Sequence, residues 1–201
     1  MPEDAPEARA DDADDPDDLI GRLLVASPQL GDPNFDRTVI IVLDHGPEGA
    51  LGVVLNRPTG LPVDEILDPW RDQALAAPPG VVFRGGPVSP DAVIGLARTE
   101  ADVIDESQWR IVLDGVGTVD LAVAPEEQPV AVCGVRMFAG YAGWSPDQLE
   151  DELADGAWIV VDALAADIFT DDADTLWHDV LQRQGGKLAL LAAYPPHPSV
   201  N

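Results

Sequence analysis

Apolar residues along the chain fall into short runs that favour β-strands, separated by turn residues. Residues 38–43 (TVIIVL) and 50–55 (ALGVVL) are almost continuously apolar and rich in β-branched side chains, which is typical of strands buried on both faces of a sheet. Residues 44–49 (DHGPEG) between them are few enough for a hairpin connection. The pattern therefore predicts a central pair of buried strands joined by a hairpin.

Strand-like runs recur along the rest of the chain. They lie at residues 21–27, 81–83, 92–97, 109–113, 116–123, 134–141 and 158–161. Asp114-Gly115, between two of these runs, is the strongest short signal for a two-residue hairpin. Strands and helical segments alternate without a regular period, and short hairpins join some of the strands. We therefore expect a mixed sheet rather than an all-parallel one.

Two segments carry apolar residues at helical spacing. Residues 63–70 place Val63, Ile66, Leu67 and Trp70 on one helical face, although Pro69 should kink or end that helix. Residues 173–181 repeat the pattern, with Asp171 or Asp172 as the expected N-cap and Gly185-Gly186 as the stop. Both segments are predicted to bury their apolar face against the sheet.

The clearest helix start in the sequence is at Ser145. Ser145 is placed to be the N-cap, a proline follows at the first helical position, and Gln148 would close a capping box. Trp144 and Leu149 would form the hydrophobic staple that accompanies such a cap. Gly156 is placed to end the helix.

Charge divides the chain into an arm and a body. Residues 1–18 carry nine acids and, apart from Met1, no apolar side chain larger than alanine, so we expect a disordered acidic arm. Residues 19–201 are predicted to form a single domain, within which residues 88–135 would form a smaller inserted subdomain. The fold class expected is α/β (mixed α+β), with a curled mixed sheet flanked by helices.

The overall composition narrows the range of partners. The 201 residues include 37 acids and 11 bases, a net charge of −26, which argues against direct nucleic-acid binding because the average field repels phosphates. No run reaches the roughly 18 apolar residues of a membrane helix. The chain has one cysteine, and its start lacks the basic and apolar parts of a signal peptide. We therefore expect a cytoplasmic protein with no membrane partner.

Three blocks of sequence together form a recognisable pattern. They are LLVASPQLGDPNFDRTVIIVLDHGPEGALGVVLNRP at residues 23–58, VVFRGGPV at 81–88, and GYAGWSPDQLEDELADGAWIVV at 140–161. In order and spacing they resemble the bacterial YqgE/AlgH family, also described as UPF0301. The resemblance covers residues 19 to about 196. Where many members end the strand after the Gly-Gly-Pro block in Leu-His, this chain has Leu96-Ala97, so no role of that histidine carries over.

The resemblance implies a compact α/β fold with a smaller α+β part in the middle of the chain. It also implies a regulatory role, because some members are described as transcriptional regulators. It brings no catalytic residues with it. The expectation for this chain is therefore a non-enzymatic regulatory or binding protein that engages a small molecule or a protein partner.

Two arginine-containing turns are the main candidates for ligand binding. Asn56-Arg57 and Arg84-Gly85-Gly86 each follow a predicted strand. Consecutive backbone N–H groups beside the two glycines could form an anion nest, so together the turns could hold a carboxylate or a phosphate. The alternative is structural, because Gly-Gly-Pro often makes a tight turn and asparagine often caps one.

Two further residues are candidates for chemistry. Tyr141 lies among glycines, where exposed aromatic residues often line a pocket. His45 follows a buried strand and adjoins Asp44, so an alternative function is a hydrolase in which His45 is the base and Asp44 its orienter, near an anion site at Arg84. A histidine in a hairpin loop can equally be a turn residue. We predict no catalytic set, no metal site and no cofactor, and we expect Cys133 to be an inert core thiol.

Overall fold

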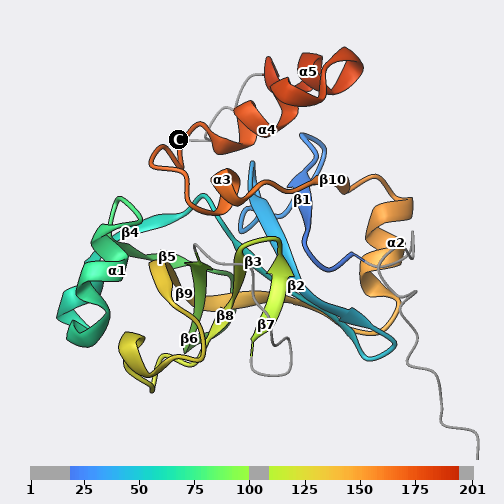
Figure 1. Ribbon diagram of the computed structural model, residues 1–201. Coiled ribbons are helices and arrows are strands. Elements are labelled where there is room, and N and C mark those ends of the chain that lie inside the picture. The colour runs from blue at the N-terminus through green and yellow to red at the C-terminus, as the bar shows by residue number, and fades with distance from the viewer. Residues whose placement is uncertain (1–18, 100–108, 195–201) are drawn as a thin grey trace, which may run out of the picture.

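The computed structural model of the protein describes residues 19–99 and 109–194. Figure 1 shows a large sheet with helices packed on it. The strands are β1 (Arg22–Ala26), β2 (Val39–Gly46), β3 (Gly49–Val54), β4 (Pro58–Pro62), β5 (Val81–Arg84), β6 (Val88–Thr99), β7 (Arg110–Leu113), β8 (Val116–Val119), β9 (Val132–Trp144) and β10 (Trp158–Asp162). The α-helices are α1 (Arg71–Leu75), α2 (Gln148–Ala154), α3 (Ala165–Ile168), α4 (Leu176–Gln184) and α5 (Gly186–Ala192), and the 3₁₀ turns are η2 (Val63–Glu65), η3 (Asp68–Trp70) and η4 (Pro125–Glu127).

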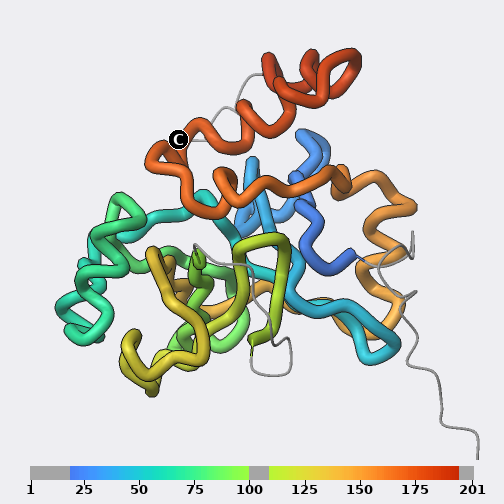
Figure 2. Tube along the Cα trace, in the orientation of Figure 1, coloured from blue at the N-terminus to red at the C-terminus, as the bar shows by residue number. Residues whose placement is uncertain are grey.

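The sheet is mixed, as the sequence predicts. Within the described residues its main path runs β10-β1-β2-β3-β9-β6-β8-β7, and β4 and β5 branch from β9. All neighbours pair antiparallel except β5 and β9, which are parallel. Strand β1 near the start of the chain pairs with β10 near its end, and Figure 2 shows these blue and orange segments side by side. Hairpins join β2 to β3 and β7 to β8, which confirms both predicted hairpins.

Both faces of the central strands are buried, which confirms the interpretation of their continuous apolar runs. Alternate residues of β2 point into two different apolar clusters, since Val39 and Ile41 belong to one and Ile40 and Val42 to the other. Helices α3 and α4 cover the first face and α2 covers the second. The central strands thus lie in the middle layer of the molecule, where apolar burial contributes about 25 cal/mol per Å².

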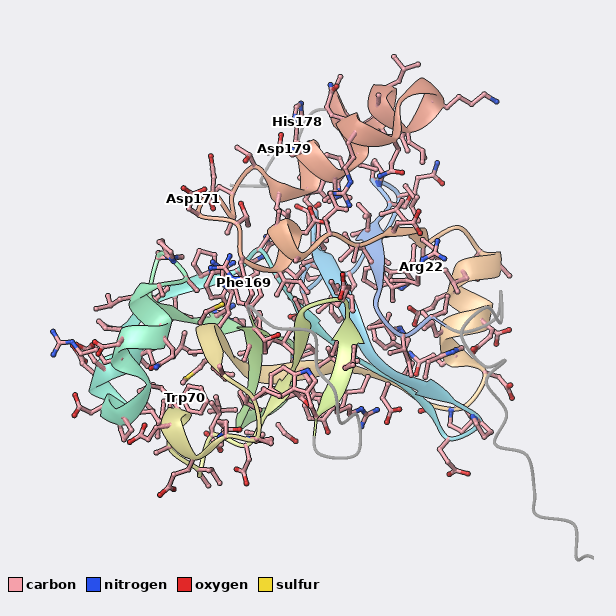
Figure 3. The ribbon with its side chains drawn as sticks, in the orientation of Figure 1. Arg22, Trp70, Phe169, Asp171, His178 and Asp179 are labelled. Carbon is pink, nitrogen blue, oxygen red and sulfur yellow. The ribbon has the colours of Figure 1, made fainter. Side chains whose placement is uncertain are left out.

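The predicted helix at residues 63–70 is wrong as a single element. The chain forms the two short turns η2 and η3 before α1 begins, because Pro69 lacks the N–H that a continuous helix needs and its ring clashes with the preceding turn. Val63 and Trp70 are buried as expected, whereas Ile66 is 48% exposed. Trp70 also donates its Nε1–H to the carbonyl of Leu121 at 3.3 Å, and Figure 3 shows Trp70 beside this segment.

The helix caps differ in detail from those expected. Helix α2 begins at Gln148, and Asp147 precedes it in a left-handed conformation without a side-chain cap. One half of the predicted capping box forms, because Gln148 Oε1 accepts the N–H of Ser145 at 3.0 Å. Trp144 and Leu149 lie in the same apolar cluster, as a staple requires.

The start of α4 also differs from the prediction. The helix begins at Leu176 after Thr175, with no side-chain cap, so neither Asp171 nor Asp172 is its N-cap. A turn precedes the helix there, so its first residue lies several positions beyond both aspartates. Gly185 ends α4 at a φ of 70°, as predicted, but a further helix, α5, begins at Gly186.

Strand β9 connects the two halves of the sheet. Its last residues pair with β3, and its earlier residues pair with β5 and β6. Between these parts Gly140 adopts a φ of 69°, and a Cβ there would lie 2.6 Å from the carbonyl oxygen of Gly86. The bend therefore requires glycine, both for its left-handed backbone and for the close approach of the neighbouring chain.

Arg136 of β9 is a charged side chain inside the core. It is 2% exposed, and burial lowers its pKa to about 10. Its guanidinium donates to the carbonyls of Ile168 and Thr170, both at 2.7 Å, and to that of Pro78. Phe169 in Figure 3 marks the segment that carries two of these carbonyls. Arg136 therefore ties β9 to the loop after α1 and to the segment after α3.

We predict that Arg136→Met lowers the free energy of unfolding by about 3 kcal/mol or more, because three carbonyls lose a charged donor. Urea unfolding followed by circular dichroism measures this. Arg71→Met is the matched control, since Arg71 makes only an exposed 3.6 Å contact with Asp64, worth less than about 1 kcal/mol. Equal losses in the two variants would show that Arg136 does not hold these segments together.

Candidate functional site

The β2–β3 hairpin brings the loop before β2 next to the residues that follow β3. Asn56, which is 3% exposed, joins the two. Its Oδ1 accepts the N–H of Val39 at 3.0 Å, and its Nδ2 donates to the carbonyl of Arg37 at 2.8 Å. Both ends of the amide are thus occupied by backbone, so Asn56 positions this region rather than presenting itself to a ligand.

Arg57 is held in place beside Asn56. Its guanidinium donates to the carbonyl of Asn56 at 3.1 Å and to that of Asp36. The N–H of Arg84 donates to the carbonyl of Arg57 at 2.8 Å, and the N–H of Val54 donates to the carbonyl of Gly85 at the same distance. The turn after β5 therefore lies directly against the end of β3, and this brings the two arginines together.

The two arginines are close enough to affect one another electrostatically. The pKa of Arg57 lies below its usual value, chiefly because burial disfavours the charged form; the charge of Arg84 lowers it further, whereas Asp36 and Asp174 raise it. In residues 19–99 and 109–194, neither guanidinium has a carboxylate oxygen within 4.0 Å. The two arginines thus form no ion pair within this distance, although the carboxylate of Asp36 is near enough to favour the charged form of Arg57.

A small pocket lies between these arginines. Its volume is about 110 Å³, and its lining includes Asn34, Arg57, Arg84, Gly86, Pro33 and Pro87. Pockets for drug-sized ligands take about 300–1,000 Å³, so this one fits a single charged group such as a carboxylate or a phosphate. We refer to it as the arginine pocket.

The glycines that follow Arg84 act differently from the predicted anion nest. The N–H of Gly85 donates to the carbonyl of Ala139 at 2.8 Å, so it is not available to a ligand. A Cβ on Gly86 would lie 2.1 Å from the carbonyl carbon of Tyr141. The glycines allow this turn to press against β9, and one of the N–H groups expected in the nest is already bonded within the protein.

Tyr141 lies near the arginine pocket only through its backbone. It pairs with Val88 across β9 and β6, and its side chain is half-buried against the first apolar cluster. Its ring is not among the groups that line the pocket. The predicted binding role of Tyr141 gains no geometric support from this arrangement.

His45 lies at the other end of the hairpin. It pairs with Ala50, whereas the turn at Gly85 is bonded to Val54, and four strand residues at about 3.3 Å each separate the two places by about 13 Å. His45 Nε2 lies 2.8 Å from Glu150 Oε1, and Asp44 pairs instead with Arg110 at 2.8 Å. The catalytic arrangement of His45, Asp44 and Arg84 considered from the sequence is therefore not formed.

Three residues of the loop before β2 were missed by the sequence analysis, namely Pro33, Asn34 and Asp36. Pro33 and Asn34 line the arginine pocket, and the carbonyl of Asp36 accepts from Arg57. The signal that could have found them is the predicted hairpin itself. The two segments that flank the open end of an antiparallel hairpin start close to one another.

The rest of the described structure offers less chemistry. A hollow of about 270 Å³ lies against Val82, Leu121 and Met137, and no ionisable side chain lines it. In the described parts of the chain, no group of three or more histidine, cysteine, aspartate or glutamate residues is arranged to hold a metal, and no helix has the length and apolar character needed to cross a membrane. Cys133 is half-buried, with its Sγ 3.2 Å from the carbonyl of Arg98.

Comparison with known proteins identifies relatives over almost the whole described chain. The sequence pattern of the AlgH-like family matches residues 23–189. A UPF0301 protein of Streptomyces coelicolor is 52% identical over 186 residues, which are 91% of this chain and 95% of the relative. The crystal structure of protein DIP2367 from Corynebacterium diphtheriae superposes with a TM-score of 0.80 at 30% identity, covering 88% of this chain and 93% of that one. The solution structure of the AlgH protein from Pseudomonas aeruginosa superposes with a TM-score of 0.62 at 28% identity, covering 92% of this chain and 98% of that one.

The contact between His45 and Glu150 predicts a pH dependence of stability. The hydrogen bond from His45 lowers the pKa of Glu150 in the folded protein. A carboxyl whose folded pKa is depressed stabilises the fold above its unfolded pKa, and this contribution is lost as the pH falls through the folded pKa. Glu150→Gln should therefore lower the free energy of unfolding by less than about 1 kcal/mol at pH 6 and leave it unchanged near pH 2.

Urea unfolding of both proteins at several pH values measures this difference. Glu126→Gln is a suitable control, because Glu126 is exposed and has no ion pair within the described residues. A loss in Glu150→Gln that stays constant from pH 6 to pH 2 would contradict the assignment to this contact.

Proposed function

The chain belongs to the AlgH-like family, and from that premise we propose that it is a non-enzymatic binding protein that takes up a small anion in the arginine pocket. The anion is a carboxylate or phosphate group, held between Arg57 and Arg84. Asn34 also lines the pocket, and its Nδ2 donates to Asp32 Oδ1 at 3.0 Å. In this proposal Asn56 and Gly86 shape the site without touching the ligand.

The observation that carries the proposal is the pair of arginines without a close carboxylate. Among the arginines of the described residues, Arg22, Arg71, Arg110 and Arg183 each have a carboxylate oxygen within 4.0 Å. Arg37 and Arg98 instead lie over aromatic rings, so what distinguishes Arg57 and Arg84 is that they line one pocket together. Arg84 disfavours the charged form of Arg57, although Asp36 favours it more strongly, and a bound anion would be attracted to both guanidinium groups.

Binding rather than catalysis is favoured by the groups around the pocket. Its lining offers two cations, one amide, prolines and glycine backbone. None of these lining side chains can serve as a nucleophile or a general base at neutral pH. The lining is suited to holding an anion and not to transferring a proton from it.

We propose that any regulatory role is exerted through a protein partner in the cytoplasm rather than through an operator on DNA. The net charge of −26 opposes the counter-ion release that drives DNA binding. A ligand that neutralises the arginine pocket would alter the charge of the surface around it. Through that change a protein partner can distinguish the ligand-bound form from the ligand-free form.

The proposal predicts that phosphate or acetate stabilises the protein against heat and that Arg84→Ala removes the effect. A ligand at 100 times its Kd adds about 2.7 kcal/mol to the folded state, which is about 5–10 °C in Tm for a domain of this size. Without ligand, Arg84→Ala should leave Tm unchanged or slightly higher, because a repulsive neighbour of Arg57 is lost. Thermal unfolding with increasing phosphate or acetate measures both effects.

Sodium chloride at matched ionic strength controls for general salt effects. Arg71→Ala is the matched variant, because it removes one positive charge away from the pocket and should keep the full ligand response. Equal shifts in Arg84→Ala and Arg71→Ala, or equal shifts from chloride, would refute anion binding in the arginine pocket.

A further inference from the structure

A second hollow adjoins the arginine pocket along the loop before β2. Its volume is about 340 Å³, and it is lined by Leu30, Gly31, Asp32, Pro33 and Asp36. Pro33 lines both hollows, so they lie side by side with this proline between them. A ligand that occupied both hollows would have to extend over Pro33.

The loop that forms this second hollow is held in shape by its own contacts. Asp32 Oδ1 accepts the N–H of Asn34 at 2.8 Å, and the carbonyl of Asp32 accepts the N–H of Phe35 at 3.0 Å. The ring of Phe35 packs edge-on against Trp158, with 5.5 Å between the ring centroids. Because the loop is already ordered, little conformational entropy is lost when a ligand binds there.

The lining of the second hollow combines apolar surface with negative charge. Leu30, Gly31 and Pro33 offer apolar contacts, and Leu30 is only partly buried. Asp32 and Asp36 place two carboxylates beside them. An uncharged apolar group gains free energy here by leaving water, whereas a negative group is repelled by both carboxylates.

We propose that the ligand of the arginine pocket is an organic monoanion with an apolar body. Its charged head lies between Arg57 and Arg84, and its apolar body lies over Pro33 against Leu30. Asp32 and Asp36 select against ligands with a second negative charge at the far end. This inference rests on the proposed function, because it requires the head group to bind in the arginine pocket.

A matched set of three ligands tests the inference: acetate has the head alone, hexanoate adds an apolar chain, and adipate adds a chain of the same length that ends in a second carboxylate. Titrations of the ¹⁵N-labelled protein, followed by the NMR signals of the arginine side chains and of the loop, give each Kd at constant ionic strength. Hexanoate should bind about tenfold more tightly than acetate, the gain expected from burying about two methylene groups. Adipate should bind no more tightly than acetate.

Two substitutions separate the parts of the proposed site. Leu30→Ala should weaken the binding of hexanoate severalfold and leave the binding of acetate unchanged, because the substitution removes contacts with the apolar chain of the ligand only. Asp36→Asn should strengthen the binding of adipate severalfold and change the Kd of hexanoate by less than twofold, since the backbone carbonyl that accepts from Arg57 is retained. Arg84→Ala should weaken both acetate and hexanoate at least tenfold.

The outcomes distinguish this inference from the function on which it rests. If acetate and hexanoate bind equally and Leu30→Ala changes neither, the apolar body is refuted while anion binding stands. If hexanoate binding survives Arg84→Ala, the chain binds elsewhere and the inference also fails. If none of the three ligands binds at millimolar concentration and phosphate gives no thermal shift, the proposed function itself fails.

Discussion

The bend of β9 at Gly140 is the constraint on which the rest of the structure depends. This strand has both antiparallel and parallel neighbours. β3 pairs antiparallel with its last residues, whereas β6 pairs antiparallel and β5 pairs parallel with its earlier residues. A side chain at Gly140 would collide with the carbonyl oxygen of Gly86. At this point β9 passes from its pairing with β5 and β6 to its pairing with β3, and the turn after β5 lies against the end of β3.

The arginine pocket is a direct result of that connection. Arg57 follows β3, Arg84 ends β5, and the turn at Gly86 packs against the backbone of Tyr141 in β9. The loop before β2 completes the pocket because Asn56 bonds it to the end of the hairpin. Rigid strands therefore set the distance between the two charges, which is the arrangement that a precise binding site requires.

Seven arginines of the described residues have three different environments, while Arg37 and Arg98 lie over aromatic rings. Arg22, Arg71, Arg110 and Arg183 face carboxylates at the surface or near it, and Arg136 is satisfied by carbonyls inside the core. Arg57 and Arg84 lie instead beside each other. The exposed ion pairs contribute little to stability, whereas the pair of Arg183 with the buried Asp167 and the contacts of Arg136 connect segments of the fold. The third environment places two positive charges at one pocket, which is why we propose it as the binding site.

Local sequence alone determined the β2–β3 and β7–β8 hairpins, the burial of the central strands on both faces, the end of α4 at Gly185 and, through its motif blocks, the family. These features depend on periodicity and turn chemistry over a few residues. Tertiary structure decided the rest. It paired His45 with Glu150, 105 positions away in sequence. It also bonded the N–H of Gly85 to the carbonyl of Ala139 and placed Arg57 beside Arg84. Such contacts depend on strand order and on the bend at Gly140, and no local pattern encodes which distant segments will share a strand.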